Sequence, residues 1–227
     1  MKATLVREIG AGFVTEDVVL ADPIGREVLV DVKASGLCHT DLTFSRNEMG
    51  TPLPMLLGHE VAGVVAAVGP EVTELAVGDH VVGCLVQSGG KCEACLTGRT
   101  FQCEHPEATL RAGDEPARVT DAHGHRVEQV FGLGGFAQQA LIHENQLVKV
   151  SDAIPFPQAA LLGCGVVTGA GAVINTANTQ AGDAVVIVGA GGVGLNAING
   201  AVVAGATTII AVDVADDKLE KARRFGA

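Results

Sequence analysis

The sequence predicts an α/β protein in two parts: a β-rich domain over residues 1–155, followed by a doubly wound domain over 156–227. Two contrasting patterns indicate this division. In the first part, EVLVDVKASG (27–36) alternates apolar and polar side chains, as half-buried strands do. In the second part, TQAGDAVVIV (179–188) predicts a turn and a buried strand, and a glycine turn, a helix and a second strand ending at Asp213 follow.

Further segments of the first part complete the β-rich prediction. KATLV (2–6), EVAGVVAAVG (60–69) and GDHVVGCLV (78–86) are predicted strands, and the last two are bounded by glycines. Residues 87–128 contain cysteines, glycines and many charges with little periodicity, so a long lobe loop is predicted there. Such a loop in a compact domain is usually functional or held by a metal.

Composition and charge argue against several classes of function. The chain has 227 residues, a formal net charge of −11 and no run of basic residues, which argues against binding of nucleic acid or of an anionic membrane. The N-terminal segment lacks the apolar core of a signal peptide, so we expect a cytoplasmic protein. The six cysteines are then more typical of metal ligands or buried thiols than of disulfides. Residues 184–212 carry no charge, but glycines divide them into strand, turn, helix and strand, so no membrane span is expected.

Gly189, Gly191 and Gly194 form a G-x-G-x-x-G motif between the first strand and the helix of the βαβ unit. Glycines in that place permit a tight turn and a close backbone approach to a pyrophosphate, which the helix N-terminus attracts. Asp213, at the end of the next strand, would accept hydrogen bonds from ribose hydroxyls and repel a 2′-phosphate, which favours NAD over NADP. The alternative is a glycine-rich turn that only packs a helix against a sheet.

Cys38, His59 and Cys164 are candidate metal ligands, although they lie far apart in the sequence. Two thiolates and one imidazole are the ligand set of an open catalytic zinc site. Glu60 follows the histidine at the start of an apolar strand. The alternatives are a structural histidine with satisfied hydrogen bonds and a nucleophilic Cys38.

Several long motifs resemble those of the zinc-dependent medium-chain alcohol dehydrogenases, in the order and spacing of that family. They are GLCHTD (36–41), GHEVAGVVAAVG (58–69), GDHVVG (78–83), GKCEACLTGRTFQC (90–103), LLGCGVVTGAGAV (161–173), VGAGGVG (188–194) and VDVADDKLEKARRFGA (212–227). The resemblance implies a GroES-like catalytic domain over 1–155, with the lobe loop at 87–128, and a Rossmann NAD-binding domain that starts at 156. Within the family, the chain resembles the aryl-alcohol branch, which has a longer lobe.

The resemblance also implies roles for individual residues. Cys38, His59 and Cys164 match the catalytic zinc ligands, and Glu60 matches an acid beside the metal. Asp41 matches the residue that orients the ligand histidine, and Thr40 matches the hydroxyl that begins a proton relay. The positions that match contacts to NAD are His39, Thr168, Gly189, Gly191, Gly192, Val193, Gly194, Asp213 and Lys218.

Three positions depart from the family pattern. Thr43 stands where many relatives end the proton relay with a histidine. Gly89 stands at the first of four lobe positions that hold a structural zinc, so only Cys92, Cys95 and Cys103 remain, with Cys84 as a conceivable replacement. Glu107 stands where glutathione-dependent relatives carry an arginine.

The expected function is that of a dehydrogenase that uses zinc and NAD. The resemblance implies reversible hydride transfer between NAD and a primary or aryl alcohol, with an aldehyde or ketone as product. The alternatives are a thiol-adduct formaldehyde dehydrogenase and a non-catalytic relative that binds zinc or NAD. We expect a small-molecule substrate and a homo-oligomer, either a dimer or a tetramer. Because the sequence ends inside the second helix of the cofactor domain, we also expect it to be a fragment of a longer protein.

Overall fold

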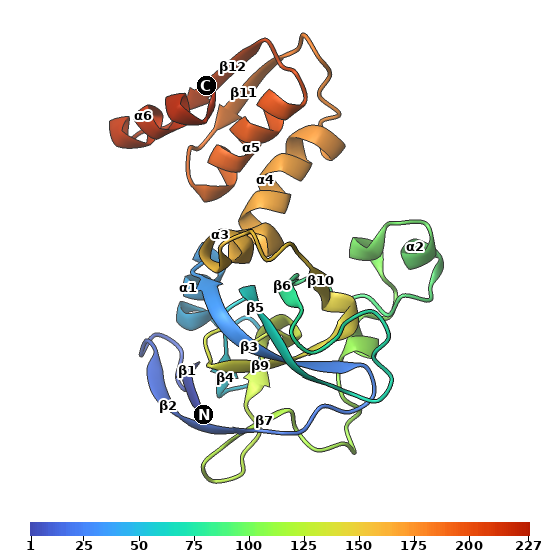
Figure 1. Cartoon of the computed structure of the whole chain (residues 1–227). Helices are drawn as coiled ribbons and strands as arrows, with labels where there is room; N and C mark the ends of the chain where they lie inside the picture. Colours follow the sequence, from blue (N-terminus) through green and yellow to red (C-terminus); the bar gives the residue numbers. More distant parts are fainter. The chain divides into compact units, whose positions relative to one another are not determined.

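A computed structural model describes all 227 residues of the chain, which form two compact units, Met1–Gly163 and Cys164–Ala227 (Figure 1). The first unit contains two five-stranded sheets. The first sheet has the strand order β7-β2-β1-β4-β8, with β1 (Lys2–Val6), β2 (Val14–Leu20), β4 (Met55–Leu56), β7 (Val119–Asp121) and β8 (Glu128–Gln129). The second has the order β10-β6-β5-β3-β9, with β3 (Glu27–Gly36), β5 (Glu60–Val68), β6 (His80–Gly83), β9 (Gln139–His143) and β10 (Leu147–Lys149). The β-rich first part is therefore confirmed.

The second sheet explains how two distant motifs meet. β3 and β5 pair antiparallel, and their register places Gly36 opposite Glu60. The chain that leaves β3 and the chain that enters β5 therefore lie at the same end of the sheet. A largely aliphatic core supports this arrangement, and its buried members include Val28, Val30, Val61, Val65, Leu133 and Ile142.

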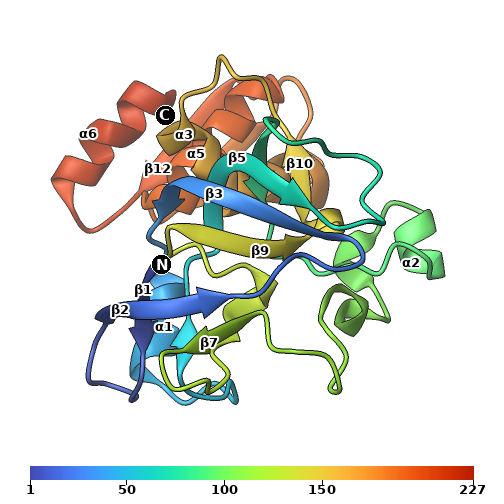
Figure 2. The same cartoon turned by 60° about the horizontal axis from the view of Figure 1, so that its bottom comes forward.

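Short helices fill the connections of the first unit. They are α1 (His39–Arg46), α2 (Glu93–Leu96) and α3 (Phe156–Leu161), with 3-10 turns η1 (Thr100–Gln102), η2 (Pro106–Thr109), η3 (Val130–Gly132) and η4 (Glu144–Gln146). The segment that carries α2 stands at the edge of the unit (Figure 2). The region 87–128, predicted as a loop, also contains β7, which pairs antiparallel with β2. Only three residues form that strand, so the sequence has no alternation from which to predict it.

One buried carboxylate ties this long region to the second sheet. Glu27, at the start of β3, accepts hydrogen bonds from the guanidinium of Arg111 at 2.6 Å and from that of Arg118 at 2.6 Å. Both arginines flank an exposed tip, residues 112–116. The two ends of the tip are therefore fixed to the same side chain.

The second unit is a βαβ unit followed by a further helix, as predicted. β11 (Ala184–Val188) and β12 (Thr208–Val212) pair in parallel, with Ala184 opposite Thr208. α5 (Gly192–Val203) connects them and α6 (Asp216–Phe225) follows. The buried core includes Ile187, Ala197, Ile198, Ala201 and Ala222. The uncharged stretch 184–212 is thus divided between β11, α5 and β12.

The helical run Phe156–Thr176 joins the units and consists of α3, a π-helical turn η5 (Leu162–Val166), α4 (Val167–Gly171) and a second π-helical turn η6 (Ala172–Thr176). By length and composition alone, this run is apolar enough to cross a membrane. Its residues Ala159 and Ala160 are, however, buried in a cluster with Ala62 and Val82 of the first unit.

Candidate metal and dinucleotide sites

The sequence CHTD (38–41) positions Cys38, the first candidate metal ligand. Cys38 is the N-cap of α1, and the carboxylate of Asp41, three residues on, accepts its backbone N–H at 2.9 Å. Asp41 is fully buried and its other oxygen accepts the backbone N–H of Gly58 at 3.2 Å. One carboxylate therefore fixes both the start of α1 and the residue before His59.

His59 is buried, with 2% of its surface exposed, and its two ring nitrogens have different surroundings. Nδ1 lies 3.3 Å from Asp41 Oδ1, whereas Nε2 has no hydrogen-bond partner. Burial lowers the pKa of His59, but the hydrogen bond and charge of Asp41 outweigh it, so the pKa is raised. A carboxylate on Nδ1 holds the tautomer in which Nε2 offers its lone pair to a metal.

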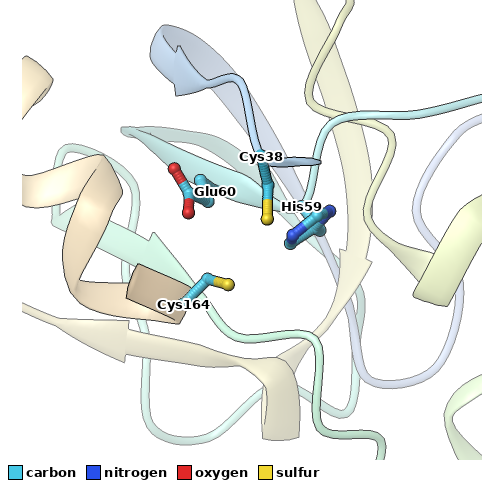
Figure 3. Close-up of side chains that lie close together, drawn as sticks. All are labelled: Cys38, His59, Glu60 and Cys164. Carbon is cyan, nitrogen blue, oxygen red and sulfur yellow. The ribbon is translucent and has the colours of Figure 1, made fainter. Parts of the chain in front are cut away.

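The candidate ligand atoms of Cys38, His59, Glu60 and Cys164 lie within 4.8 Å of one another. Figure 3 shows the four side chains gathered in one place. Cys164 directly follows Gly163 and lies in the π-helical turn η5. Burial raises the pKa of Cys38, but hydrogen bonds with Thr40 and the nearby imidazole of His59 outweigh this effect, so the pKa is lowered. Two sulfur atoms, an imidazole nitrogen without a partner and a buried carboxylate form a donor set that fits Zn²⁺.

Two neighbours complete the surroundings of this site. The Thr40 hydroxyl lies 3.6 Å from the Cys38 sulfur. Phe131 packs edge-on against the His59 ring at a centroid distance of 5.7 Å, and its backbone has φ of 57°, which is rare for a bulky residue. Sequence reasoning missed Phe131, although the glycine-rich run FGLGGF that it begins could have drawn attention to it.

The glycine motif forms a tight turn between β11 and α5. Gly189 has φ of 96°, in the left-handed region that favours glycine, and Gly191 is the N-cap of α5. A Cβ at Gly194 would overlap the carbonyl oxygen of Gly189, so helix and turn approach each other as closely as glycine allows.

Asp213 ties the glycine turn to the end of β12. Its carboxylate accepts the backbone N–H of Ala190 at 2.8 Å and that of Ala215 at 3.1 Å, and these bonds lower its pKa. The ammonium of Lys218 lies 3.7 Å away. The other predicted cofactor contacts are exposed residues: His39 on α1, Thr168 on α4, and Gly192 and Val193 at the start of α5.

A second thiol cluster lies in the lobe. The sulfur atoms of Cys92, Cys95 and Cys103 lie within 4.8 Å of one another. Backbone hydrogen bonds from Glu104 and Cys95 lower the pKa of Cys92 to about 7, whereas burial and the neighbouring thiols raise the pKa of Cys95. Cys84 is not a member of either cluster.

The fold and these sites define a class: a β-rich unit with a candidate metal site, followed by a dinucleotide-type βαβ unit. Residues 25–152 match the alcohol dehydrogenase GroES-like domain. The chain therefore belongs to the zinc-dependent medium-chain alcohol dehydrogenase family.

Relatives and solved structures agree with this assignment. The chain is 39% identical over 229 residues to the S-(hydroxymethyl)glutathione dehydrogenase of Paracoccus denitrificans, covering 99% of this chain and 61% of that protein. It is 40% identical to the NDMA-dependent alcohol dehydrogenase of Amycolatopsis methanolica, covering 100% of this chain and 61% of that protein. Among solved structures, an alcohol dehydrogenase zinc-binding domain protein from Burkholderia ambifaria has a TM-score of 0.94 at 43% identity, and the benzyl alcohol dehydrogenase of Acinetobacter calcoaceticus has 0.88 at 41%. All of this chain, and 62% of each solved chain, is covered.

Proposed function

We propose that this chain belongs to an NAD-dependent zinc alcohol dehydrogenase that interconverts a primary or aryl alcohol and its aldehyde. The observation that carries the proposal is the buried His59 Nε2, which has no hydrogen-bond partner while Asp41 holds Nδ1. A buried polar atom without a partner is costly, and a metal ion would satisfy it. Cys38, His59 and Cys164 would hold the zinc, with Glu60 as the acid beside it.

Zinc, when bound, supplies a Lewis acid that favours loss of the proton of an alcohol, and NAD supplies the hydride acceptor. The chain's own residues would orient the metal ligands and carry the alcohol proton away. Asp41 orients the His59 ring. Thr40 places its hydroxyl beside Cys38, where it would receive the alcohol proton. Because Thr43 replaces the histidine that ends the relay in many relatives, the proton would leave by ribose hydroxyls and water.

The second unit would bind NAD. The turn Gly189–Gly194 brings backbone N–H groups to the N-terminus of α5, where a pyrophosphate is attracted. We propose that Asp213 and Lys218 contact the adenosine ribose, and that His39, Thr168 and Val193 contact other parts of the cofactor. The carboxylate of Asp213 would repel a 2′-phosphate, which favours NAD over NADP.

An aryl alcohol is the favoured substrate, because benzyl alcohol dehydrogenase is among the similar solved structures. The Paracoccus relative supports a thiol-adduct formaldehyde dehydrogenase as the second candidate. Against it, Glu107 is exposed and would repel the carboxylates of glutathione. A cytoplasmic homo-oligomer, dimeric or tetrameric, without nucleic-acid or membrane partners is part of the same proposal.

The test combines zinc content with turnover. We expect the zinc content of the purified chain to fall on Cys38→Ser and to stay unchanged on Cys84→Ser, a matched control outside both thiol clusters. In the complete enzyme, NADH should form from benzyl alcohol, and Glu107→Arg should raise activity on S-(hydroxymethyl)glutathione only. A correctly folded chain whose zinc content does not depend on Cys38 would contradict the proposed metal site.

A further inference from the structure

The lobe cluster has three cysteines, whereas a closed four-thiolate site has four. The Cys92 sulfur lies 3.5 Å from that of Cys95 and 3.9 Å from that of Cys103. α2 starts directly after Cys92 and carries Cys95 in its single turn, while Cys103 approaches from the end of η1. Three sulfur atoms from two short segments therefore converge on one point.

Two backbone N–H groups contact one sulfur atom of the cluster. The N–H of Gly89 donates to Cys103 Sγ at 3.2 Å, and the N–H of His105 donates to the same atom at 3.3 Å. These two hydrogen bonds fix the position of one sulfur atom beside the other two, as hydrogen bonds to metal-binding side chains generally do. The lobe is therefore preorganised for a cation, even without a fourth cysteine.

No protein side chain is available for the fourth coordination position of a tetrahedral metal. Gly89 lies within hydrogen-bond distance of Cys103 but has no side chain, and no fourth histidine, cysteine or carboxylate belongs to the cluster. The His105 ring is nearby in sequence, but its Nδ1 lies 3.2 Å from the Glu107 carboxylate. Tetrahedral zinc on three protein ligands keeps an open position, which water or a substrate then fills.

We propose that the lobe holds a thiophilic metal ion, zinc in the cell, on Cys92, Cys95 and Cys103, with its fourth position open to an external ligand such as water or a small thiol. The lobe metal is then exchangeable, unlike the metal of a closed four-cysteine site. This inference concerns the lobe alone and does not depend on the proposed dehydrogenase activity.

The test loads the full, reduced chain with ¹¹³Cd²⁺ as a thiophilic probe and records its NMR spectrum. A resonance that disappears in Cys103→Ser, or in Cys92→Ser if the first variant does not fold, belongs to the lobe. A resonance that disappears in Cys38→Ser belongs to the other cluster. We expect 2-mercaptoethanol to shift the lobe resonance in the direction of added sulfur coordination.

Gly89→Cys gives a more decisive test. A fourth cysteine should fill the open coordination position and abolish the response of the lobe resonance to added thiol. A Cβ at Gly89 would lie 3.1 Å from the His105 carbonyl oxygen and 3.2 Å from Ala108 Cβ, so a small local shift is needed. If this variant does not fold, the thiol response of the unsubstituted chain remains decisive. A lobe resonance indifferent to thiol, or no lobe resonance at all, would overturn the proposal. Loss of the Cys38-dependent resonance alone would count against the proposed enzyme and leave this inference intact.

Discussion

Asp41→Asn tests how much of the candidate zinc site depends on one buried carboxylate. The carboxylate accepts two backbone N–H groups, at 2.9 and 3.2 Å, and lies 3.3 Å from His59 Nδ1. An asparagine keeps the shape but turns an NH₂ toward one of these donors and removes the charge. A hydrogen bond to a charged group contributes roughly 1.5–3 kcal/mol, so we expect the metal-free chain to lose about 3 kcal/mol of unfolding free energy.

The same substitution should weaken zinc binding about 10- to 100-fold, which is typical when the residue that orients a ligand histidine is changed. Zinc affinity is measured by competition with a chromophoric chelator, and stability by urea unfolding of the metal-free chain. Asp17→Asn is the control, because Asp17 is exposed and pairs only with Lys2 on the surface. Our reading of Asp41 would be refuted if the two variants had equal zinc affinity and equal unfolding midpoints.

Three further predictions address the relay, the glycine turn and pH. Thr40→Val should lower kcat of the complete enzyme about 10²- to 10⁴-fold while zinc content stays constant, because only the hydroxyl is lost; unchanged kcat would exclude Thr40 from the relay. Gly194→Ala should lower stability by about 1–3 kcal/mol through overlap with Gly189, seen as a lower melting temperature, and an unchanged one would contradict the close approach. Burial and two nearby arginines lower the pKa of His143 to about 4. From pH about 6.5 down to 4, the unfolded chain takes up a proton that the native chain refuses, so stability falls by up to about 3 kcal/mol. In urea unfolding, His143→Asn, which retains an acceptor for the N–H of Asn145, should lose less stability over that range, and equal losses would refute the assignment.

Much of the fold was predictable, because local sequence patterns indicate its strands and its βαβ unit. Alternating apolar residues predicted β3, and an apolar stretch bounded by glycine predicted β5. The glycine motif between two apolar runs predicted the βαβ unit. In contrast, β7 has three residues and exists because β2 offers it a pairing edge. No local pattern specifies such a strand.

The candidate metal site was predicted by residue type, not by geometry. Cysteines and a histidine indicated zinc, but their convergence depends on the Gly36–Glu60 register and on the π-helical turn around Cys164. The strained Phe131 against His59 could not be predicted, because its left-handed backbone depends on packing around it. The roles assigned to individual residues stay predictions.

The clamp formed by Glu27 has a consequence for how the chain tolerates breaks and insertions. Arg111 precedes the exposed tip 112–116 and Arg118 follows it, and both are held by the same carboxylate. A protease cut within the tip would therefore leave both new ends anchored, so the nicked chain should stay folded as one body. For the same reason, a peptide tag inserted there adds only loop-closure entropy, which grows slowly with length. The tip is the natural place to label this protein without disturbing either thiol cluster.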